Sequence, residues 1–426
     1  MKARSHALLM RLVAGLLTWQ RLQRLMAVVS LYAALSLPLG GLYRYPWQMP
    51  GVAIRLSCAA AIAVLQYVAR GCKPLFDEWT LPFEITRAVL RCMVTYYSPV
   101  ILHQPTAQYM RRQSDWAGHV LGMIACRRDG TETKSFLYNG LEHVWVRSQS
   151  PQSSRGHERR YVVLYYHGGG YAILSPKYYI SSTSDLLVRI RQQLQAKSNE
   201  TVSVEVLLAN YRKTPEHPYP APPDDALVMY QYLLDVERVP PQNIIIAGDS
   251  AGAGLALTTL LRVRDENPLK LPRAAILSCP YVDLEMRGDE RKVPYCIVAD
   301  GAVHAIPKGY VPWGGSPETW GDASPLHCNL GGLPPVYIIT GEFDYILPQA
   351  HRLMERAKED GATDWQLDVH KHMSHVFMNL PTFILPQATK GLDAMAAFAT
   401  AKWSAKEAPE NLTNLRGPET CEILKL

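Results

Sequence analysis

From residue 141 to residue 400, short apolar runs alternate with longer segments of helical periodicity. The runs predict strands covered on both faces, and apolar positions three to four residues apart predict amphipathic helices. The predicted strands are 141–146, 161–166, 202–208, 244–247, 274–278, 336–340 and 366–370. The predicted helices are 180–194, 253–261, 347–359 and 383–398. This alternation predicts an α/β fold with a mostly parallel sheet and helices on both faces.

The first 75 residues follow another pattern. Two apolar runs, 26–42 and 52–69, come after a basic cluster formed by Lys2, Arg4, Arg11, Arg21 and Arg24. A helix needs about 20 apolar residues to cross a bilayer, and each run is slightly short or interrupted, the second by Arg55. We expect residues 1–75 to form a membrane anchor. A pair of amphipathic helices packed on the rest of the chain is the alternative.

Charge gives this segment an orientation. The bias of positive residues places the N-terminus in the cytosol, so one span leaves the remainder in the lumen and two return it to the cytosol. Two glycosylation sequons, Asn199-Glu-Thr201 and Asn411-Leu-Thr413, favour the lumen. The net charge of +6 includes no Lys/Arg block of the kind that binds nucleic acid, so no nucleic-acid partner is expected.

The remaining segments complete the predicted organisation. Residues 76–140 are expected to form cap or connector helices before an α/β domain at 141–403. Residues 284–330 lack periodicity and are rich in Pro, Gly and aromatics, which predicts a lid insertion. The polar stretch 148–160 is interpreted as a hairpin tip, and 404–426 as a polar tail. The eight cysteines have no C-x-x-C or zinc spacing and are expected to be buried thiols, with one or two disulfides left open.

The candidate chemistry begins at Gly248-Asp-Ser-Ala-Gly252, a G-x-S-x-G sequence between a predicted strand and a predicted helix. That context places Ser250 on a sharp turn with its hydroxyl exposed, as a nucleophile requires. The alternative is a Gly-rich turn with an incidental serine. The N–H of Ala251 begins the helix and is predicted to face a developing oxyanion. The sequence His167-Gly-Gly-Gly170 follows a strand and predicts two more donors, the N–H groups of Gly168 and Gly169.

A nucleophilic serine needs a base, and the base needs an orienting acid. Asp344 and His375 follow successive predicted strands and come after the serine in the order that this turn type favours. Glu342 is the rival acid and His372 the rival base.

The spacing of His370, His372 and His375 could suggest a metal site, yet no further Cys or acid cluster completes a ligand set. We therefore expect no metal and no cofactor. A second pair of acids, Asp224 and Asp225, is interpreted as first-turn residues favoured by a helix dipole.

Four motifs in this order resemble the hormone-sensitive-lipase family of α/β-hydrolases over roughly residues 140–400. They are His167-Gly-Gly-Gly170, Tyr211-Arg-Lys-Thr-Pro-Glu-His-Pro-Tyr-Pro220, Gly248-Asp-Ser-Ala-Gly252 and Pro280-Tyr-Val-Asp-Leu284. The resemblance implies Ser250 as nucleophile with Asp344 and His375, and oxyanion donors at Gly168, Gly169 and Ala251. Two motifs depart from the family pattern. Asp344-Tyr-Ile-Leu-Pro348 lacks the second acid of Asp-x-Leu-x-Asp, and His375-Val-Phe377 replaces His-Gly-Phe.

The resemblance implies a serine carboxylic-ester hydrolase that forms an acyl-enzyme on small hydrophobic esters. With its apolar N-terminal segment, the chain is also similar to arylacetamide deacetylases and fungal steryl acetyl hydrolases, which are anchored in the endoplasmic reticulum. This similarity implies that location, and steryl or secondary-metabolite acetates as substrates. An amidase or formamidase with the same residues, or a non-catalytic receptor on this fold, is the alternative. The sequence carries no signal for an oligomeric state.

Overall fold

A computed structural model describes residues 41–43, 45–102, 106–149, 159–197, 202–286 and 293–405. The basic cluster, nearly all of the first apolar run and the polar tail from residue 406 lie outside these ranges. Both glycosylation sequons have their asparagines, Asn199 and Asn411, outside the described residues as well.

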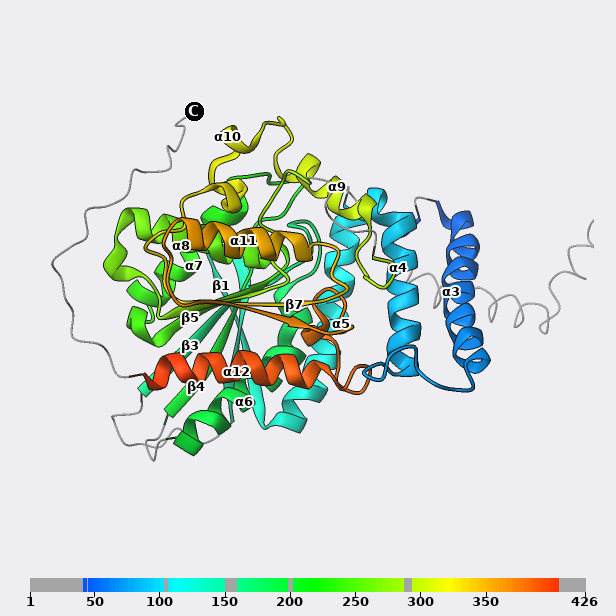
Figure 1. The fold of residues 1–426 in the computed structure, drawn as a ribbon, viewed down its shortest axis with the longest axis horizontal. Coiled ribbons are helices and arrows are strands. Elements are labelled where there is room, and N and C mark those ends of the chain that lie inside the picture. Colours follow the sequence, from blue (N-terminus) through cyan, green and yellow to red (C-terminus); the bar gives the residue numbers. More distant parts are fainter. Residues whose placement is uncertain are drawn as a thin grey trace, which may run out of the picture.

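The described chain is built on one eight-stranded sheet with helices on both faces (Figure 1). The strands run in the order β1-β2-β4-β3-β5-β6-β7-β8 across the sheet. They are β1 (Thr131–Tyr138), β2 (Leu141–Ser148), β3 (Arg159–Tyr166), β4 (Val202–Ala209), β5 (Ile244–Asp249), β6 (Ala274–Ser278), β7 (Val336–Gly341) and β8 (Trp365–His370). The six strands β3 to β8 are mutually parallel, whereas β2 is antiparallel to both of its neighbours. The predicted α/β fold with a mostly parallel sheet is therefore confirmed.

The helices divide between the two faces of the sheet. They are α3 (Met49–Ala69), α4 (Leu81–Ile101), α5 (Thr106–Asp129), α6 (Ile180–Lys197), α7 (Ala221–Asp235), α8 (Ala251–Glu266), α9 (Asp300–Tyr310), α10 (Pro317–Trp320), α11 (Leu347–Glu359) and α12 (Ala388–Ser404). In Figure 1, α7, α8 and α11 lie on one side of the sheet, and α6 and α12 on the other. The helices α3 and α4 pack together at one end of the molecule.

Strand β3 shows how the residues produce these two layers. Successive side chains of a strand point to opposite faces. Accordingly Leu164 and Tyr166 join the core beneath α7, α8 and α11, whereas Val163 and Tyr165 join the core beneath α6 and α12. Because both faces are covered, the strand reads as one continuous apolar run.

Three expectations differ from the structure. Strands β2 and β3, which flank the predicted hairpin tip at 148–160, do not pair with each other, because β4 lies between them and pairs with both. The connector predicted at 76–140 ends in strand β1, whose polar, mostly exposed residues gave no strand signal. The last helix begins at Ala388 instead of residue 383. Gln387 is its N-cap residue, and Pro386 precedes the cap.

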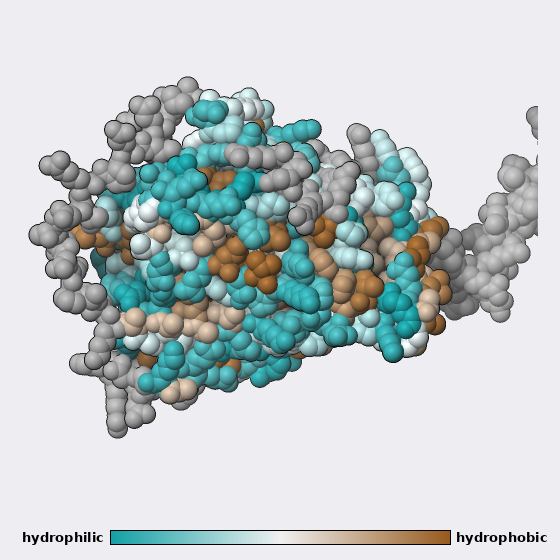
Figure 2. All heavy atoms as spheres, in the orientation of Figure 1, coloured by the Kyte–Doolittle hydropathy of each residue, from teal (hydrophilic) through white to brown (hydrophobic). Residues whose placement is uncertain are grey.

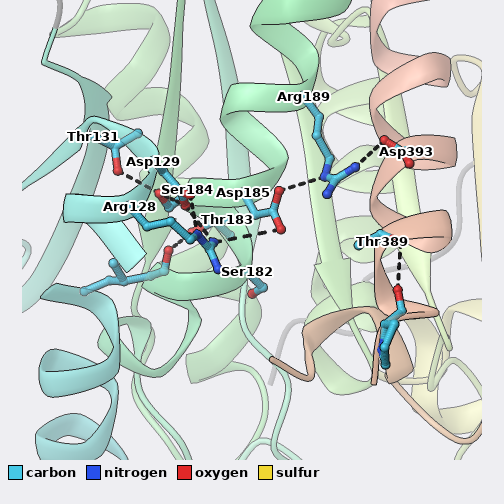
Figure 3. Close-up of polar contacts among 12 residues, drawn as sticks. Arg128, Asp129, Thr131, Ser182, Thr183, Ser184, Asp185, Arg189, Thr389 and Asp393 are labelled. Carbon is cyan, nitrogen blue, oxygen red and sulfur yellow. Dashed lines mark hydrogen bonds and ion pairs between the residues drawn. The ribbon is translucent and has the colours of Figure 1, made fainter. Parts of the chain in front are cut away.

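Polar contacts join helix α6 to the end of α5 and to α12 (Figure 3). Arg189 of α6 pairs with Asp185 on the same helix at 2.7 Å and with Asp393 of α12. Asp129 at the end of α5 accepts a 2.8 Å hydrogen bond from Ser184, which also contacts Thr131 of β1. These bonds connect the helical layer to the edge of the sheet.

Asp225 is a buried anchor of α7. Its carboxylate accepts hydrogen bonds from the Arg212 side chain at 2.8 and 2.9 Å, from the Arg212 N–H at 2.8 Å and from Asn139 at 3.1 Å. Its neighbour Asp224 lies in the first turn of the helix, is half exposed and pairs with Arg262. The first-turn interpretation therefore suits Asp224, whereas Asp225 joins the β1–β2 turn to the segment before α7.

We expect Asp225→Ala to lower the free energy of unfolding by about 1–3 kcal/mol, because it removes the buried acceptor of the hydrogen bonds from Arg212 and Asn139. Asp224→Ala is the matched control, and losing its exposed ion pair should change stability by less than about 1 kcal/mol. Urea unfolding followed by fluorescence measures both. Equal effects of the two substitutions would contradict the assignment of Asp225 as the anchor.

Candidate active site

Ser250 occupies a strained turn at the end of β5. Its backbone lies at φ 51° and ψ −120°, a region that side-chain-bearing residues rarely adopt. The turn is possible only because the residues two positions before and two positions after Ser250 are glycines, which have no Cβ. A Cβ on Gly248 would lie 2.3 Å from the carbonyl oxygen of Gly252, and a Cβ on Gly252 would lie 2.0 Å from that of Tyr166. Ser250 remains partly exposed, so its hydroxyl is accessible.

The structure brings the predicted acid and base together. Asp344 follows β7 and His375 follows β8, and the His375 Nδ1 lies 2.9 and 3.0 Å from the two carboxylate oxygens of Asp344. Both side chains are buried, at 5% and 2% exposure for His375 and Asp344. The carboxylate also accepts hydrogen bonds from the Thr340 hydroxyl and the Ile346 N–H, each at 3.1 Å.

The charges of this pair reinforce each other. Burial lowers the pKa of His375, but the charge and hydrogen bond of Asp344 raise that pKa above its usual value. Burial raises the pKa of Asp344, but His375 and several hydrogen bonds lower it below its usual value. An ionised carboxylate only accepts, so Nδ1 carries the donated proton and Nε2 is left free to accept one.

Ser250 lies at the same edge of the sheet as this pair, because β5, β6, β7 and β8 are parallel neighbours and end there. The Ser250 N–H donates to the Ser278 carbonyl at 2.9 Å. The next residue, Cys279, places its Sγ within 4.8 Å of both an Asp344 oxygen and a His375 ring nitrogen. Within the described residues, no hydrogen bond joins Ser250 to His375. Such contacts commonly tighten only when substrate binds.

The rival residues have other partners. Glu342 is exposed and accepts the backbone N–H of His372 at 2.9 Å. The His372 Nδ1 lies 2.8 Å from Glu78, and His370 lies 3.2 Å from Asp368. The three histidines of the H-x-H-x-x-H sequence therefore do not converge on one point.

Two sets of side chains in the described ranges have the composition of a metal site. The first, Cys279, Asp344 and His375, contains the hydrogen-bonded acid–base pair itself. The second contains Asp283, Glu285 and His327, but the Arg352 guanidinium already lies 3.2 Å from Asp283. In each set, at least one of the ligand atoms already has a protein partner.

The glycine loop after β3 corrects one predicted donor. The N–H of Gly168 donates to Asp249 Oδ1 at 3.0 Å and lies 3.1 Å from the Tyr179 hydroxyl, so it is not free to bind an oxyanion. The N–H groups of Gly169, Gly170 and Ala251 donate to no group in the described part of the chain. These three are the available donors.

Asp249 connects the nucleophile turn to this loop. Besides the Gly168 N–H, it accepts hydrogen bonds from the hydroxyls of Tyr165 at 3.0 Å and Tyr179 at 2.9 Å. Burial raises the pKa of Asp249 to about 6, although the tyrosine hydrogen bonds oppose the increase. The sequence analysis assigned no role to Asp249, although this residue directly precedes Ser250.

Cys279 is a second residue that sequence reasoning missed. It is fully buried, its backbone is left-handed at φ 46°, and its Sγ accepts the Val376 N–H at 3.1 Å. A hydrogen bond from Cys279 is among the interactions that lower the pKa of Asp344. Its position directly after β6, between the strands of Ser250 and Asp344, was the available signal. The seven described cysteines are free thiols, and Cys421 lies outside the described residues.

Comparison with known proteins identifies the family of this chain. A family model described as the α/β hydrolase fold matches residues 163–379. The chain is 31% identical to an acetyl-hydrolase of Streptomyces hygroscopicus over 55% of this chain and 74% of that one. It is 30% identical to an esterase of Acinetobacter venetianus over 56% and 75%.

Solved structures agree as well. EstE5 is 27% identical, with a TM-score of 0.59 over 76% of this chain and 100% of that one. An esterase from the bacterial hormone-sensitive lipase family is 25% identical, with a TM-score of 0.56 over 82% and 98%. The chain therefore belongs to the hormone-sensitive-lipase family of α/β-hydrolases. As the esterases and acetyl-hydrolases among these relatives indicate, it is a carboxylic-ester hydrolase.

The nucleophile turn gives a direct test of this local geometry. Gly252→Ala should destabilise the fold by about 3 kcal/mol or prevent folding, because backbone carbonyls cannot move away from the added methyl group. Gly309→Ala in α9 is the control, since its nearest neighbour would lie at an ordinary 3.6 Å. The thermal unfolding midpoints of both variants and of wild type measure the loss of stability. A Gly252→Ala protein as stable as wild type would show that the turn is looser than described.

Proposed function

We propose that Ser250, His375 and Asp344 form a catalytic triad that hydrolyses esters through an acyl-enzyme. Ser250 attacks the carbonyl carbon while His375 Nε2 takes its proton, and His375 then gives that proton to the leaving alcohol. Water, deprotonated by the same nitrogen, releases the acid and restores the serine. The observation that carries the proposal is the buried His375–Asp344 hydrogen bond at the strand edge where Ser250 is presented.

The donors for the tetrahedral oxyanion differ from those expected from the sequence. We assign this role to the N–H groups of Gly169, Gly170 and Ala251, because Gly168 is already bonded to Asp249. Backbone donors fixed before substrate arrives stabilise charge without reorganising during the reaction. Asp249 supports them by holding the first peptide of the loop.

The proposed substrates are esters of small acyl groups with hydrophobic alcohols, including steryl or secondary-metabolite acetates. The names of two relatives support a small acyl group, the acetyl-hydrolase and a human protein named arylacetamide deacetylase-like 3, which is 33% identical over 27% of this chain. An amide substrate for the same residues is the second candidate, and matched esters and anilides separate the two.

We further propose that the N-terminal segment attaches this catalytic unit to a membrane, with the endoplasmic reticulum as its location. One described helix, α3, is long and apolar enough to span a bilayer, and little of it is buried. Four of its large apolar side chains, Ile54, Ile62, Leu65 and Val68, are exposed, whereas Met49 and Val52 are buried. Hydrophobic residues gather at this end of the molecule in Figure 2.

Labelling by a fluorophosphonate probe tests the triad. Wild type should react at one serine, and Ser250→Ala and His375→Ala should both lose the label, because only an activated serine is nucleophilic. Ser182→Ala on α6 is the serine control, and His351→Ala on the exposed side of α11 is the histidine control; both should keep labelling. A folded wild type that does not react would favour the receptor alternative.

The pH dependence follows from the acid–base pair. His375 must be neutral to accept a proton, and its pKa is raised by Asp344, so kcat/KM should fall as pH drops through a midpoint above about 6.5. Initial rates on a soluble short-chain ester between pH 5 and 9 give the midpoint. A profile that stays flat down to pH 5 would exclude a His375 base of this kind.

A further inference from the structure

A short segment between α3 and α4 contacts the loop that carries His375. This segment, residues 76–80, is called the strap below. Its Trp79 is 3% exposed and donates from Nε1 to the carbonyl of His372 at 2.8 Å. Glu78 accepts a hydrogen bond from the His372 Nδ1 at 2.8 Å. His372 lies three residues before His375.

The strap also contacts the loop that carries Asp344. The ring of Phe76 stacks on the His372 imidazole, with centroids 4.3 Å apart, and lies 5.1 Å from the ring of Phe343. Phe343 directly precedes Asp344. The strap therefore packs on both loops that supply the acid–base pair.

These two loops are bonded to each other under the strap. The Glu342 N–H donates to the His370 carbonyl at 2.9 Å, and the Phe343 N–H donates to the Met373 carbonyl at 2.8 Å. Glu342 accepts the His372 N–H through its carboxylate. Movement of one loop therefore displaces the other.

The backbone at His372 needs an external support. His372 has a left-handed conformation at φ 58°, and Val376, directly after His375, has φ 47°. Such conformations persist in residues with side chains only where the surroundings enforce them. The Trp79 hydrogen bond to the His372 carbonyl and the Glu78 contact to its ring supply that enforcement.

We propose that the strap is a positioning element for the reaction, in which Trp79 and Glu78 hold His372 and thereby fix His375 against Asp344. This inference rests on the proposed triad. It assigns a catalytic consequence to a segment that directly follows the candidate membrane helix. His372, the rival base in the sequence, acts here as the point where the strap is attached.

The test uses the full-length protein with Trp79→Phe and Glu78→Gln. The first keeps an aromatic ring and removes the N–H donor, and the second removes the charge that faces His372. We expect each to lower kcat roughly three- to tenfold with KM within twofold of wild type, since Trp79→Phe loses one hydrogen bond to a strained residue and Glu78→Gln weakens one by removing its charge. The acidic limb of kcat/KM should move to lower pH, because a loosened Asp344 raises the pKa of His375 less. Asp344 and Asp249 are the charged groups that act on His375.

Two substitutions serve as matched controls. Trp365→Phe changes a tryptophan at the start of β8, at the end of the strand opposite to the His375 loop. Its N–H has no hydrogen-bond partner among the described residues. Asp77→Asn changes the exposed acid next to Glu78. Both should keep the kcat, KM and pH profile of wild type.

The outcomes separate this inference from the triad. If His375→Ala is inactive while Trp79→Phe and Glu78→Gln match wild type in kcat and pH profile, the strap has no positioning role. A rise in KM at unchanged kcat would also overturn it, since that result assigns the strap to substrate binding. If His375→Ala keeps fluorophosphonate labelling, the triad itself is wrong.

Discussion

The rest of this active site depends on a charged hydrogen bond kept out of water. A buried carboxylate is stable only when donors replace its hydration, and Asp344 has donors from His375, Thr340 and the Ile346 backbone. Because the solvation of both groups is lost, their mutual attraction is strong enough to lower the pKa of the acid and raise that of the base. The loops after β7 and β8 must be held together for this bond to exist, and the turn after β5 must present Ser250 at the same edge of the sheet.

The parallel arrangement of the strands brings these loops together. Strands β5, β7 and β8 all end at the same edge of the sheet. Ser250, Asp344 and His375, which follow these strands within a few residues, therefore lie near one another. The strand between β5 and β7, β6, also contributes contacts to the site. Its last residue, Ser278, accepts the Ser250 N–H through its carbonyl, and the next residue, Cys279, accepts the N–H of Val376 in the His375 loop through its thiol. Strain at Ser250, Cys279 and His372 is concentrated at this edge, as expected where function requires unusual backbone conformations.

The sequence was informative wherever a local pattern determines the outcome. Continuous apolar runs predicted the buried strands, and G-x-S-x-G between a strand and a helix predicted the turn at Ser250. Strand β1 was missed because it is a polar edge strand, and the hairpin was wrong because an apolar run does not encode its neighbour in the sheet. Gly168 was assigned as a donor because its competing acceptor, Asp249, comes from a different strand. The Trp79–His372 hydrogen bond joins residues 293 positions apart, and no local pattern indicates such a contact.

The N-terminal segment connects these observations. A helix that only anchored the protein would need no specific contacts with the catalytic loops, and a flexible linker would suffice. Instead, the chain leaves α3 and within a few residues packs three aromatic or acidic side chains on the loops of Asp344 and His375. It then continues into α4, where Arg91 donates to the carbonyls of Val293, Cys296 and Val298. Cys296 in turn accepts the N–H of Tyr345, the residue after Asp344. The same N-terminal region therefore contacts the loops of the acid–base pair from two directions, as expected of a part of the proposed catalytic structure that is also a candidate anchor.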